Sequence, residues 1–355
     1  MTLRSISLHN TRSYGLYSAE LHPDITLILG RNGSGKTTLL EAIYVLHQGT
    51  SFRGRDRDMI SHDSDKTEFK LEFNDQPTRR LSIASSPDGK TVKQFTYDGS
   101  SAARLPAKHR LPVVLFEPDE LRLLTSSPQR RRDFIDSIIA RLSPTYATVL
   151  SRFARALLQR NELLKQHDSM SQSDWQNHLF AWDVKLAELS SSIIKARINF
   201  ITHSNDHLSR LYSDLAGSDH TVKARYASPF TTTATLEQAI LHKLESSRSF
   251  DIMRGYTSVG PHRDDIELDL DNHPAASVAS RGELRTIMLA FKLLEVELQE
   301  HHTGKKPLIL LDDVFSELDS TREQKLMQSL EKYQTIITAT DLRDDLKVNA
   351  TIISL

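Results

Sequence analysis

The sequence predicts an α/β protein whose two ends together build one domain around a mixed sheet, with an all-helical domain inserted between them. Three observations lead to this prediction. A glycine-rich motif follows a short apolar run near the N-terminus, and an apolar run ending in two carboxylates lies near the C-terminus. Between them, strand-like alternation stops and helical spacing begins. The predicted boundaries are 1–118 and 255–355 for the two parts of the first domain, and 119–254 for the insertion.

The N-terminal motif, Gly30-Arg-Asn-Gly-Ser-Gly-Lys-Thr37, fits G-x-x-x-x-G-K-[ST]. In such a loop the backbone amides cradle phosphate oxygens, the lysine reaches the terminal phosphates and the threonine binds magnesium. Thr26–Leu29 reads as a strand before it, and Thr37–Leu46 has helical spacing after it, which is the context that the motif requires. The predicted phosphate-binding residues are Gly30, Arg31, Asn32, Gly33, Ser34, Gly35, Lys36, Thr37 and Thr38.

The C-terminal motif is the apolar run Pro307–Leu311 followed by Asp312 and Asp313. In a nucleotide-hydrolysing core such a strand lies beside the phosphate loop, where one acid binds the metal and the next polarises water. The alternative is that these acids only cap the following helix. The first motif supplies the phosphate-binding groups and the second supplies the acids. We therefore predict Lys36, Asp312 and Asp313 as catalytic residues, and Thr37 and Asp312 as ligands of Mg²⁺.

Composition narrows the function classes. The net charge is −1, so any nucleic-acid surface has to be a local patch. The absence of cysteine excludes disulfides, thiolate catalysis and cysteine-bound metal sites. No signal-peptide pattern and no apolar stretch of about 20 residues is present, so we expect a cytoplasmic protein without a membrane partner.

The remaining elements are predicted in chain order. Phe69–Phe73 alternates with period two and is followed by further short strands broken by turns, which indicates antiparallel pairing, and Val113–Phe116 is a last strand. Apolar stripes over Tyr146–Leu164 and Leu179–Phe200 predict two helices, and the polar residues 166–174 between them predict a turn. We therefore predict that these two helices form an antiparallel hairpin of modest length within one chain, in preference to a zipper between two chains.

Strands and helices alternate again after Arg254. Ile266–Leu270 alternates, a helix is predicted from Ser280 to about His301, and another over Thr321–Lys332. Thr335–Ala339 reads as a buried strand. We do not interpret His262, Arg263, Asp264 and Asp265 as a metal cluster, because four adjacent side chains on an irregular segment cannot all converge on one ion.

Ser280-Arg-Gly-Glu283 has two compatible interpretations. Ser-x-x-Glu is a capping box, in which serine and glutamate bond to each other's backbone amides. ABC-type ATPases also carry a Ser-x-Gly-Gln-like signature at a helix start, and Ser280 and Gly282 match it in order and type. A helix N-terminus with a serine hydroxyl and a glycine suits close approach to a γ-phosphate.

The order of motifs resembles the bacterial RecF recombination-repair proteins, relatives of the structural-maintenance-of-chromosomes ATPases, over essentially the whole chain. Glu283 departs from the usual glutamine, Phe116–Glu120 varies a segment that usually reads serine-proline, and no histidine follows Ala339. The motifs that carry the resemblance are Gly30–Thr37, Ser51–Gly54, Arg130–Asp136, Gly260–Asp265, Ser280–Glu283 and Leu310–Asp319.

The resemblance implies an ABC-type ATPase head that binds ATP and Mg²⁺ and dimerises head to tail. Ser280 and Gly282 of one subunit would then face the ATP held by Lys36 of the other, with Asp319 in the crossing loop. Arg12 is a weaker candidate for a phosphate or adenine contact; the alternative is a surface arginine on a strand edge.

DNA binding is expected in the insertion. Residues 120–165 contain nine basic and four acidic side chains, which is enough for backbone contacts without base reading. A solvated helix face with salt bridges is the alternative. The predicted DNA-binding residues are Arg130, Arg131, Arg132, Arg152 and Arg155.

The leading hypothesis is an ATP-dependent DNA clamp of recombinational repair, replication restart and the SOS response. It would be a weak, DNA-stimulated ATPase that binds double-stranded DNA near gaps and at single-strand/double-strand junctions, and promotes RecA loading with RecO and RecR. A second hypothesis is an architectural ATP-bound dimer in which hydrolysis is incidental. A third, the ATPase subunit of a transporter, is disfavoured by the long helical insertion.

Overall fold

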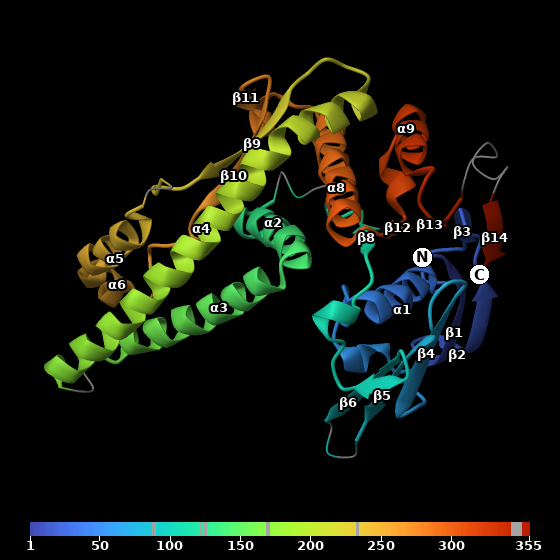
Figure 1. Ribbon diagram of the computed structural model, residues 1–355, viewed down its shortest axis with the longest axis horizontal. Helices are drawn as coiled ribbons and strands as arrows, with labels where there is room; N and C mark the ends of the chain where they lie inside the picture. The colour runs from blue at the N-terminus through green and yellow to red at the C-terminus, as the bar shows by residue number, and fades with distance from the viewer. Residues whose placement is uncertain are drawn as a thin grey trace. The chain divides into compact units, whose positions relative to one another are not determined.

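Strands dominate both ends of the chain, and helices dominate its middle (Figure 1). The computed structural model describes residues 1–86, 88, 90–120, 123, 126–167, 171–231, 234–341 and 350–355. The chain divides into two units, one made of residues 1–121 and 291–355 and the other of residues 122–290. None of the helices in these described ranges combines the length and the apolar character needed to cross a membrane.

The first unit contains two sheets. Its strands are β1 (Leu3–Thr11), β2 (Tyr14–Glu20), β3 (Ile25–Leu29), β4 (Lys66–Phe73), β5 (Arg79–Ser85), β6 (Thr91–Tyr97), β7 (Ser100–Ala102), β8 (Val113–Phe116), β12 (Leu308–Asp312), β13 (Thr335–Ala339) and β14 (Ala350–Ser354). Its helices are α1 (Lys36–Gln48), the last part of α8 (Arg281–Thr303), α9 (Ser320–Leu330) and the short 3-10 turns η1 (Asp56–Met59), η2 (Ala107–His109) and η4 (Val314–Glu317).

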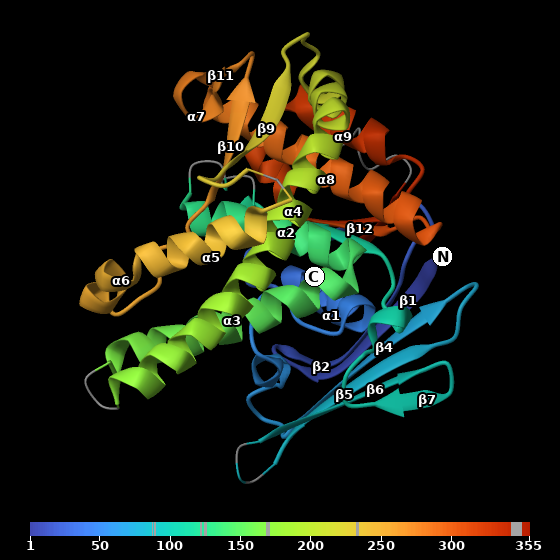
Figure 2. The same ribbon diagram turned by 60° about the vertical axis from the view of Figure 1, so that its left-hand side comes forward.

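One sheet is antiparallel, with the strand order β2-β1-β4-β5-β6-β7 (Figure 2). The alternation in β4 explains its orientation, because Thr67, Phe69, Leu71 and Phe73 are buried while the residues between them are not. The buried face packs on α1, which also contacts strands of the second sheet. Helix α1 therefore lies between the two sheets.

The second sheet is parallel and is built from both ends of the chain, in the order β14-β3-β13-β12-β8. Its strands β12 and β13 are buried at every position, as expected for parallel strands covered on both faces. The meeting of the two ends in one domain is confirmed. However, the antiparallel and parallel strands form separate sheets instead of one mixed sheet.

The second unit is built around the hairpin of α3 (Pro144–Lys165) and α4 (Gln172–Ala216). The hairpin is confirmed, but α4 continues for 45 residues, well beyond the predicted Phe200. The other elements are α2 (Pro128–Leu142), β9 (Val222–Ala227), α5 (Leu236–Ser246), α6 (Arg248–Arg254), β10 (Asp265–Leu270), β11 (His273–Pro274), α7 (Ala275–Val278) and the first part of α8 (Arg281–Thr303).

The insertion is not helical throughout. Strand β9 pairs with β10 in a small antiparallel sheet, and its alternating burial reflects the alternating sequence Val-Lys-Ala-Arg. The inserted unit was expected to end at residue 254, but it ends at residue 290. The reason is that β10 pairs with β9 of the insertion and not with a sheet of the first unit.

Candidate functional site

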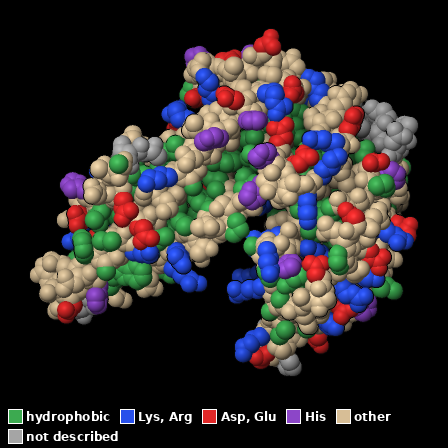
Figure 3. Space-filling view, viewed as in Figure 1, with side chains coloured by type: hydrophobic (Ala, Val, Ile, Leu, Met, Phe, Trp, Pro, Cys, Tyr) green, Lys and Arg blue, Asp and Glu red, His purple; other side chains and the backbone are tan. Residues whose placement is uncertain are grey.

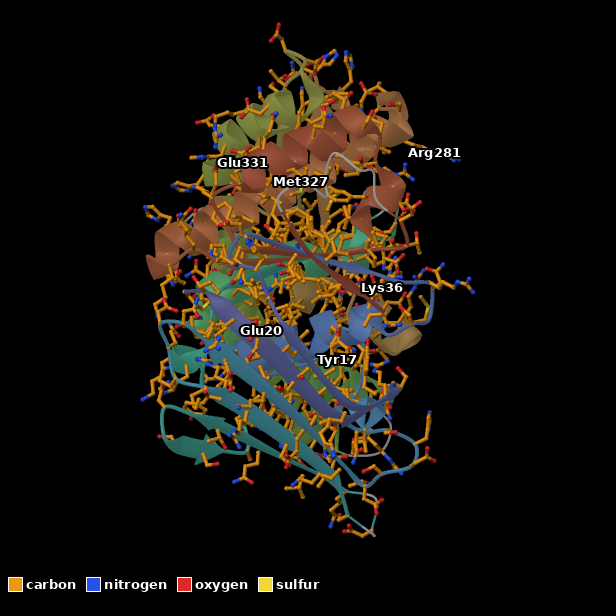
Figure 4. All side chains as sticks on the ribbon, turned by 90° about the vertical axis from the view of Figure 1, so that its right-hand side faces the viewer. Tyr17, Glu20, Lys36, Arg281, Met327 and Glu331 are labelled. Carbon is orange, nitrogen blue, oxygen red and sulfur yellow. The ribbon has the colours of Figure 1, made fainter. Side chains whose placement is uncertain are left out.

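The glycine-rich loop connects β3 to α1 in the first unit. Lys36, labelled in Figure 4, begins α1, and its Nζ donates to the carbonyl oxygens of Gly30 at 2.6 Å and Arg31 at 3.2 Å. The backbone N–H of Gly30 donates to Ala339 O at 3.2 Å, which ties the start of the loop to the end of β13. The loop thus wraps around the ammonium group that we predicted to meet phosphate.

Gly35 is required by both its backbone and its neighbour. Its φ of +102° lies in the left-handed region, and a Cβ at this position would lie 2.6 Å from Tyr14 Oη. Tyr14 also donates a long hydrogen bond to Ser34 O at 3.4 Å. Burial raises the pKa of Tyr14 to about 12, so the hydroxyl stays protonated and the ring forms a fixed wall of the loop.

Thr37 and Asp312 come together from opposite ends of the chain. Thr37 Oγ1 donates to Asp312 Oδ1 at 3.0 Å, and Thr338 Oγ1 donates to the same oxygen at 2.8 Å. Asp312 ends β12, which is separated from β3 only by β13. A hydroxyl beside a carboxylate is a set of hard oxygen donors of the kind that Mg²⁺ prefers, so these two residues fit the predicted metal.

Asp313 follows at the tip of β12 with a φ of 52°, and its N–H donates to Thr338 O at 3.1 Å. Its side chain makes no capping bond to the turn η4, which removes the helix-cap interpretation for this residue. Burial raises the pKa of Asp313, Asp312 and Glu317 raise it further, and Lys36 opposes them. A carboxylate whose proton affinity is raised in this way suits a group that orients or accepts a proton from water.

These residues share a cavity of about 510 Å³, a size suited to a small-molecule ligand. Of the predicted residues, Gly30, Arg31 and Ser34 shape the loop, and the others from the first unit line the cavity. The lining residues are Arg12, Ser13, Asn32, Gly33, Gly35, Lys36, Thr37, Thr38, Arg53, Asp58, Ile60, His62, Asp312 and Asp313.

Arg12 belongs to the cavity wall and not to a free strand edge. Its guanidinium pairs with Glu41 at 2.6 Å, and Glu41 is fully buried in α1 and also accepts from Ser51 Oγ. Arg53, Asp58 and His62 were not predicted individually. The sequence pointed to this part of the cavity wall through the motif Ser51–Gly54. Ser51 Oγ accepts hydrogen bonds from the backbone N–H groups of Arg53 and Gly54, which hold Arg53 in place.

Glu117 adds a further acid that the sequence did not single out. It follows β8, whose Phe116 pairs with Leu311, the residue before Asp312. Burial raises its pKa to about 7, and Glu120 and Asp312 add to the rise while Lys292 opposes it. The acidic edge of the parallel sheet therefore continues onto β8.

Ser280 and Gly282 lie in the second unit, at the start of α8. The capping box is present, because Ser280 N–H donates to Glu283 Oε2 at 2.7 Å and Glu283 N–H donates to Ser280 Oγ at 3.3 Å. Gly282 O accepts from Thr286 Oγ1 at 2.9 Å inside the first turn. The local geometry therefore leaves the signature-like residues at an exposed helix start.

The predicted DNA-binding arginines separate into two groups. Arg130, Arg152 and Arg155 are exposed on α2 and α3. Arg132 is 6% exposed and donates to Asp264 O and Gln129 Oε1, so burial removes it from a DNA surface. Arg131 is held by Asp265, with Nε to Oδ1 at 2.9 Å and a second bond to Oδ2, and its charge is already neutralised.

The segment Gly260–Asp265 explains why these two arginines are engaged. It is pinned to the helices by buried polar groups, since Arg197 donates to Pro261 O at 2.7 Å and pairs with Asp136 at 2.8 Å. Tyr226 donates to Asp264 at 2.5 Å. Arg131 and Arg132 thus hold this segment against α2.

The chain is similar in sequence to known proteins over nearly its whole length. Residues 2–350 match the model of the RecF/RecN/SMC N terminal domain. The DNA replication and repair protein RecF of Gloeobacter violaceus is 33% identical over 350 residues, which cover 96% of this chain and 92% of that protein. The RecF of Streptococcus uberis is 35% identical over 349 residues, covering 96% and 94%.

Solved structures agree with the sequence comparison. A structure of the recombination mediator protein RecF with ATP, in the RecFOR pathway, has a TM-score of 0.83 and 28% identity, covering 97% of this chain and 93% of that one. The Smc head domain of Pyrococcus furiosus has a TM-score of 0.51 and 19% identity, covering 99% and 93%, and shares the fold. The predicted ABC-type ATPase head is therefore confirmed as the fold class.

Proposed function

The chain belongs to the RecF family of the RecF/RecN/SMC ATPases, and on this premise we propose that it is an ATP-dependent DNA-binding protein of recombinational repair and replication restart. The observation that carries the proposal is the cavity in which Lys36, Thr37, Asp312 and Asp313 meet. The RecF protein whose structure contains ATP has the same fold over nearly the whole chain.

The roles of the residues follow from phosphate chemistry. Lys36 and the loop amides of Asn32–Thr37 hold the β- and γ-phosphates of ATP, and Asp313 orients or polarises the attacking water. Thr37 and Asp312 would hold Mg²⁺, whose charge offsets that of the phosphates when it is bound. Hydrolysis is slow and is stimulated by DNA.

The second half of the site comes from another copy of the chain. Ser280 and Gly282 sit at the exposed start of α8, where a helix N-terminus with a glycine suits a γ-phosphate. We propose that ATP joins two subunits head to tail, so that each site uses Lys36 of one chain and Ser280 of the other. The dimer then closes on duplex DNA near gaps and at junctions, and promotes RecA loading with RecO and RecR.

DNA contacts are assigned to Arg130, Arg152 and Arg155, which are exposed and make no ion pair within the described ranges. Contacts of this kind to the backbone are independent of sequence and weaken with salt. Replacing Arg152 and Arg155 by glutamine is expected to weaken duplex binding and to flatten its salt dependence, whereas replacing Arg131 is expected to disturb the Gly260–Asp265 segment instead.

The decisive experiment is the mass of the protein in solution with ATP and Mg²⁺, with and without duplex DNA. We expect a dimer only with ATP for the native chain, and monomers for Lys36→Ala and Ser280→Arg. A dimer that forms without nucleotide would overturn the ATP-driven arrangement.

The architectural alternative is separated from the clamp by Asp313→Asn. If repair in cells survives in full while the ATP-bound dimer persists, hydrolysis is incidental and the architectural dimer is correct. If repair is lost although the dimer forms and binds DNA, turnover is required.

A further inference from the structure

Aromatic rings and guanidinium groups alternate on the surface around the end of α6 in the second unit. The guanidinium carbon of Arg254 lies 4.4 Å from the ring centre of Phe250, and that of Arg263 lies 4.7 Å from the ring centre of Tyr256. Arg254 also donates to Tyr256 Oη at 2.9 Å, which joins the two pairs. We call Phe250, Arg254, Tyr256 and Arg263 the arginine–aromatic surface.

This surface combines free positive charge with exposed apolar area. Phe250 is 42% exposed and the adjacent Met253 is 75% exposed. Figure 3 shows a small group of hydrophobic side chains at the position of α6. Within the described part of the chain neither Arg254 nor Arg263 pairs with a carboxylate, and Arg263 instead donates to Thr257 O at 3.1 Å. A ligand that supplies negative charge and a flat apolar face would complement both features.

The base of the surface is rigid. Arg160, fully buried on α3, donates to Asp251 of α6 at 2.7 Å and to Thr257 Oγ1 at 3.0 Å. Asp251 in turn accepts from the N–H of Ser258 at 3.0 Å. Because these buried bonds fix the backbone on both sides of Arg254 and Tyr256, binding a ligand there would require little further ordering.

We propose that the arginine–aromatic surface binds unpaired nucleotides of single-stranded DNA, with a base stacked on the exposed ring or guanidinium plane and the phosphate near Arg254 or Arg263. Such stacking accepts any base, because every base presents a flat π-face. The proposal rests on the proposed DNA-binding function and names the part of the DNA that this surface takes. An acidic peptide would use the charge but would leave the exposed rings without a partner.

The position of the surface fits a junction between duplex and single strand. Helix α3 carries Arg152 and Arg155, and it also contacts α6. Asn161 of α3 accepts from the N–H of Thr257, which follows α6, at 2.8 Å. At a rise of 1.5 Å per residue, Arg155 and Asn161 are about 9 Å apart along the helix. A duplex held by the arginines of α3 would thus end a few nucleotides from the stacking surface.

The test compares two DNA molecules that differ only in an unpaired tail. Affinities of the full chain, with ATP and Mg²⁺, are measured by fluorescence anisotropy for a blunt duplex and for the same duplex with a short thymine tail. A third probe carries 2-aminopurine in the tail, whose emission reports stacking. For the native chain we expect the tail to tighten binding about tenfold or more, from one or two stacked bases.

Phe250→Ala and Arg254→Ala are expected to remove this gain and the 2-aminopurine quenching, and to leave blunt-duplex affinity unchanged. Phe180→Ala is the matched control, because Phe180 is 48% exposed on α4 and no arginine among the described residues stacks on it. Since all three side chains are exposed, unchanged thermal melting is expected and confirms that the variants are folded.

The outcomes separate the two levels of the proposal. If the native chain binds the blunt duplex but gains nothing from the tail, or if Phe250→Ala keeps the gain, the stacking surface is wrong while the proposed function stands. The stacking surface is also wrong if an acidic peptide binds at Arg254 without displacing the thymine tail from the protein. If the native chain binds neither DNA, the proposed function fails as well.

Discussion

At the scale of single residues, Asp313 is the group whose chemistry is set most clearly by its surroundings. Replacing it by asparagine keeps the shape and removes the proton acceptor, so we expect ATP binding to persist and hydrolysis to fall by about 100-fold or more. Phosphate release and the affinity for a fluorescent ATP analogue measure the two effects. Asp312→Asn is the contrasting variant, because it removes a predicted metal ligand and should weaken Mg²⁺-dependent binding too. Equal loss of binding in both variants would contradict the separate roles.

The direction in which the pKa of Asp313 is shifted also predicts how ATP hydrolysis depends on pH. Because burial and neighbouring acids raise its pKa, the carboxylate becomes protonated at a higher pH than an ordinary aspartate does. Hydrolysis at saturating ATP should therefore decline, as the pH falls, earlier than an unperturbed aspartate would predict. A rate profile that stays flat down to the ordinary range of an aspartate would contradict this role.

His47 predicts a pH dependence of stability. It is fully buried in α1, burial lowers its pKa to about 3, and its Nε2 has no hydrogen-bond partner in the described structure. Between about pH 6.5 and 3 the unfolded chain binds a proton that the folded chain does not, so the free energy of unfolding falls as the pH falls. The full effect is of order 5 kcal/mol.

His47→Phe should flatten this dependence. Urea unfolding at pH 7 and pH 5 measures it, and the difference between variant and native chain isolates His47 from other titrating groups. His301→Phe, at the exposed end of α8, is the control. Parallel curves for His47→Phe and the native chain would show that His47 does not titrate differently on folding.

The residues that could be predicted from the sequence are those whose chemistry fixes their spacing. Lys36 and Asp312 are of this kind, because a phosphate loop needs its lysine at one position and a metal-binding strand needs its acid at the tip. The burial of Arg132 could not be predicted, since it depends on Asp264, which lies in a distant segment. His62 reaches the cavity through a loop whose path has no periodic signal.

At the scale of elements, β9 shows how a helix protects a strand edge. Asn205 of α4 accepts from Ala224 N–H at 2.8 Å and donates to Ala224 O at 3.1 Å, and Ser209 makes the same pair of bonds with Val222. One turn apart on the helix, these side chains replace a neighbouring strand. They satisfy backbone groups that would otherwise offer an open edge.

Asn205→Ala should therefore lower the free energy of unfolding by about 1–3 kcal/mol, the cost of leaving buried backbone groups unpaired. Asp206→Ala, at the adjacent exposed position, is the matched control and should change little. Urea unfolding followed by circular dichroism measures both. Equal effects of the two variants would show that the Asn205 bonds do not protect the strand.

The same strand marks the limit of prediction for elements. The hairpin of α3 and α4 was predictable because long apolar stripes repeat at helical spacing. Strand β9 is short and lies after a 45-residue helix, and its partner β10 comes much later in the chain. Alternation over Val222–Tyr226 was present, but only pairing with β10 and capping by α4 make it a strand.

At the scale of the whole molecule, the two predicted halves of the nucleotide site belong to different units. Lys36, Thr37, Asp312 and Asp313 lie in the first unit, whereas Ser280 and Gly282 lie in the second. Helix α8 runs from one unit into the other, so ATP bound at Ser280 would act on a helix that is continuous with the first unit. The proposed head-to-tail dimer therefore takes the two halves of each site from two copies of the chain.

Mixing two inactive variants tests whether the nucleotide site is shared between two copies. Lys36→Ala loses the phosphate loop and Ser280→Arg blocks the signature helix, so each variant alone should have almost no ATPase activity. In a mixed head-to-tail dimer, one site combines the native Lys36 of one chain with the native Ser280 of the other, while the second site carries both changes. Because each mixed dimer has one intact site, the mixture should regain measurable ATPase activity that neither variant has alone. Mixing Lys36→Ala with Asp312→Asn is the control, since both changes lie in the first unit and pairing then restores no site. Recovery in the first mixture alone requires that the nucleotide be shared between subunits, whereas no recovery in the first mixture would contradict the shared site.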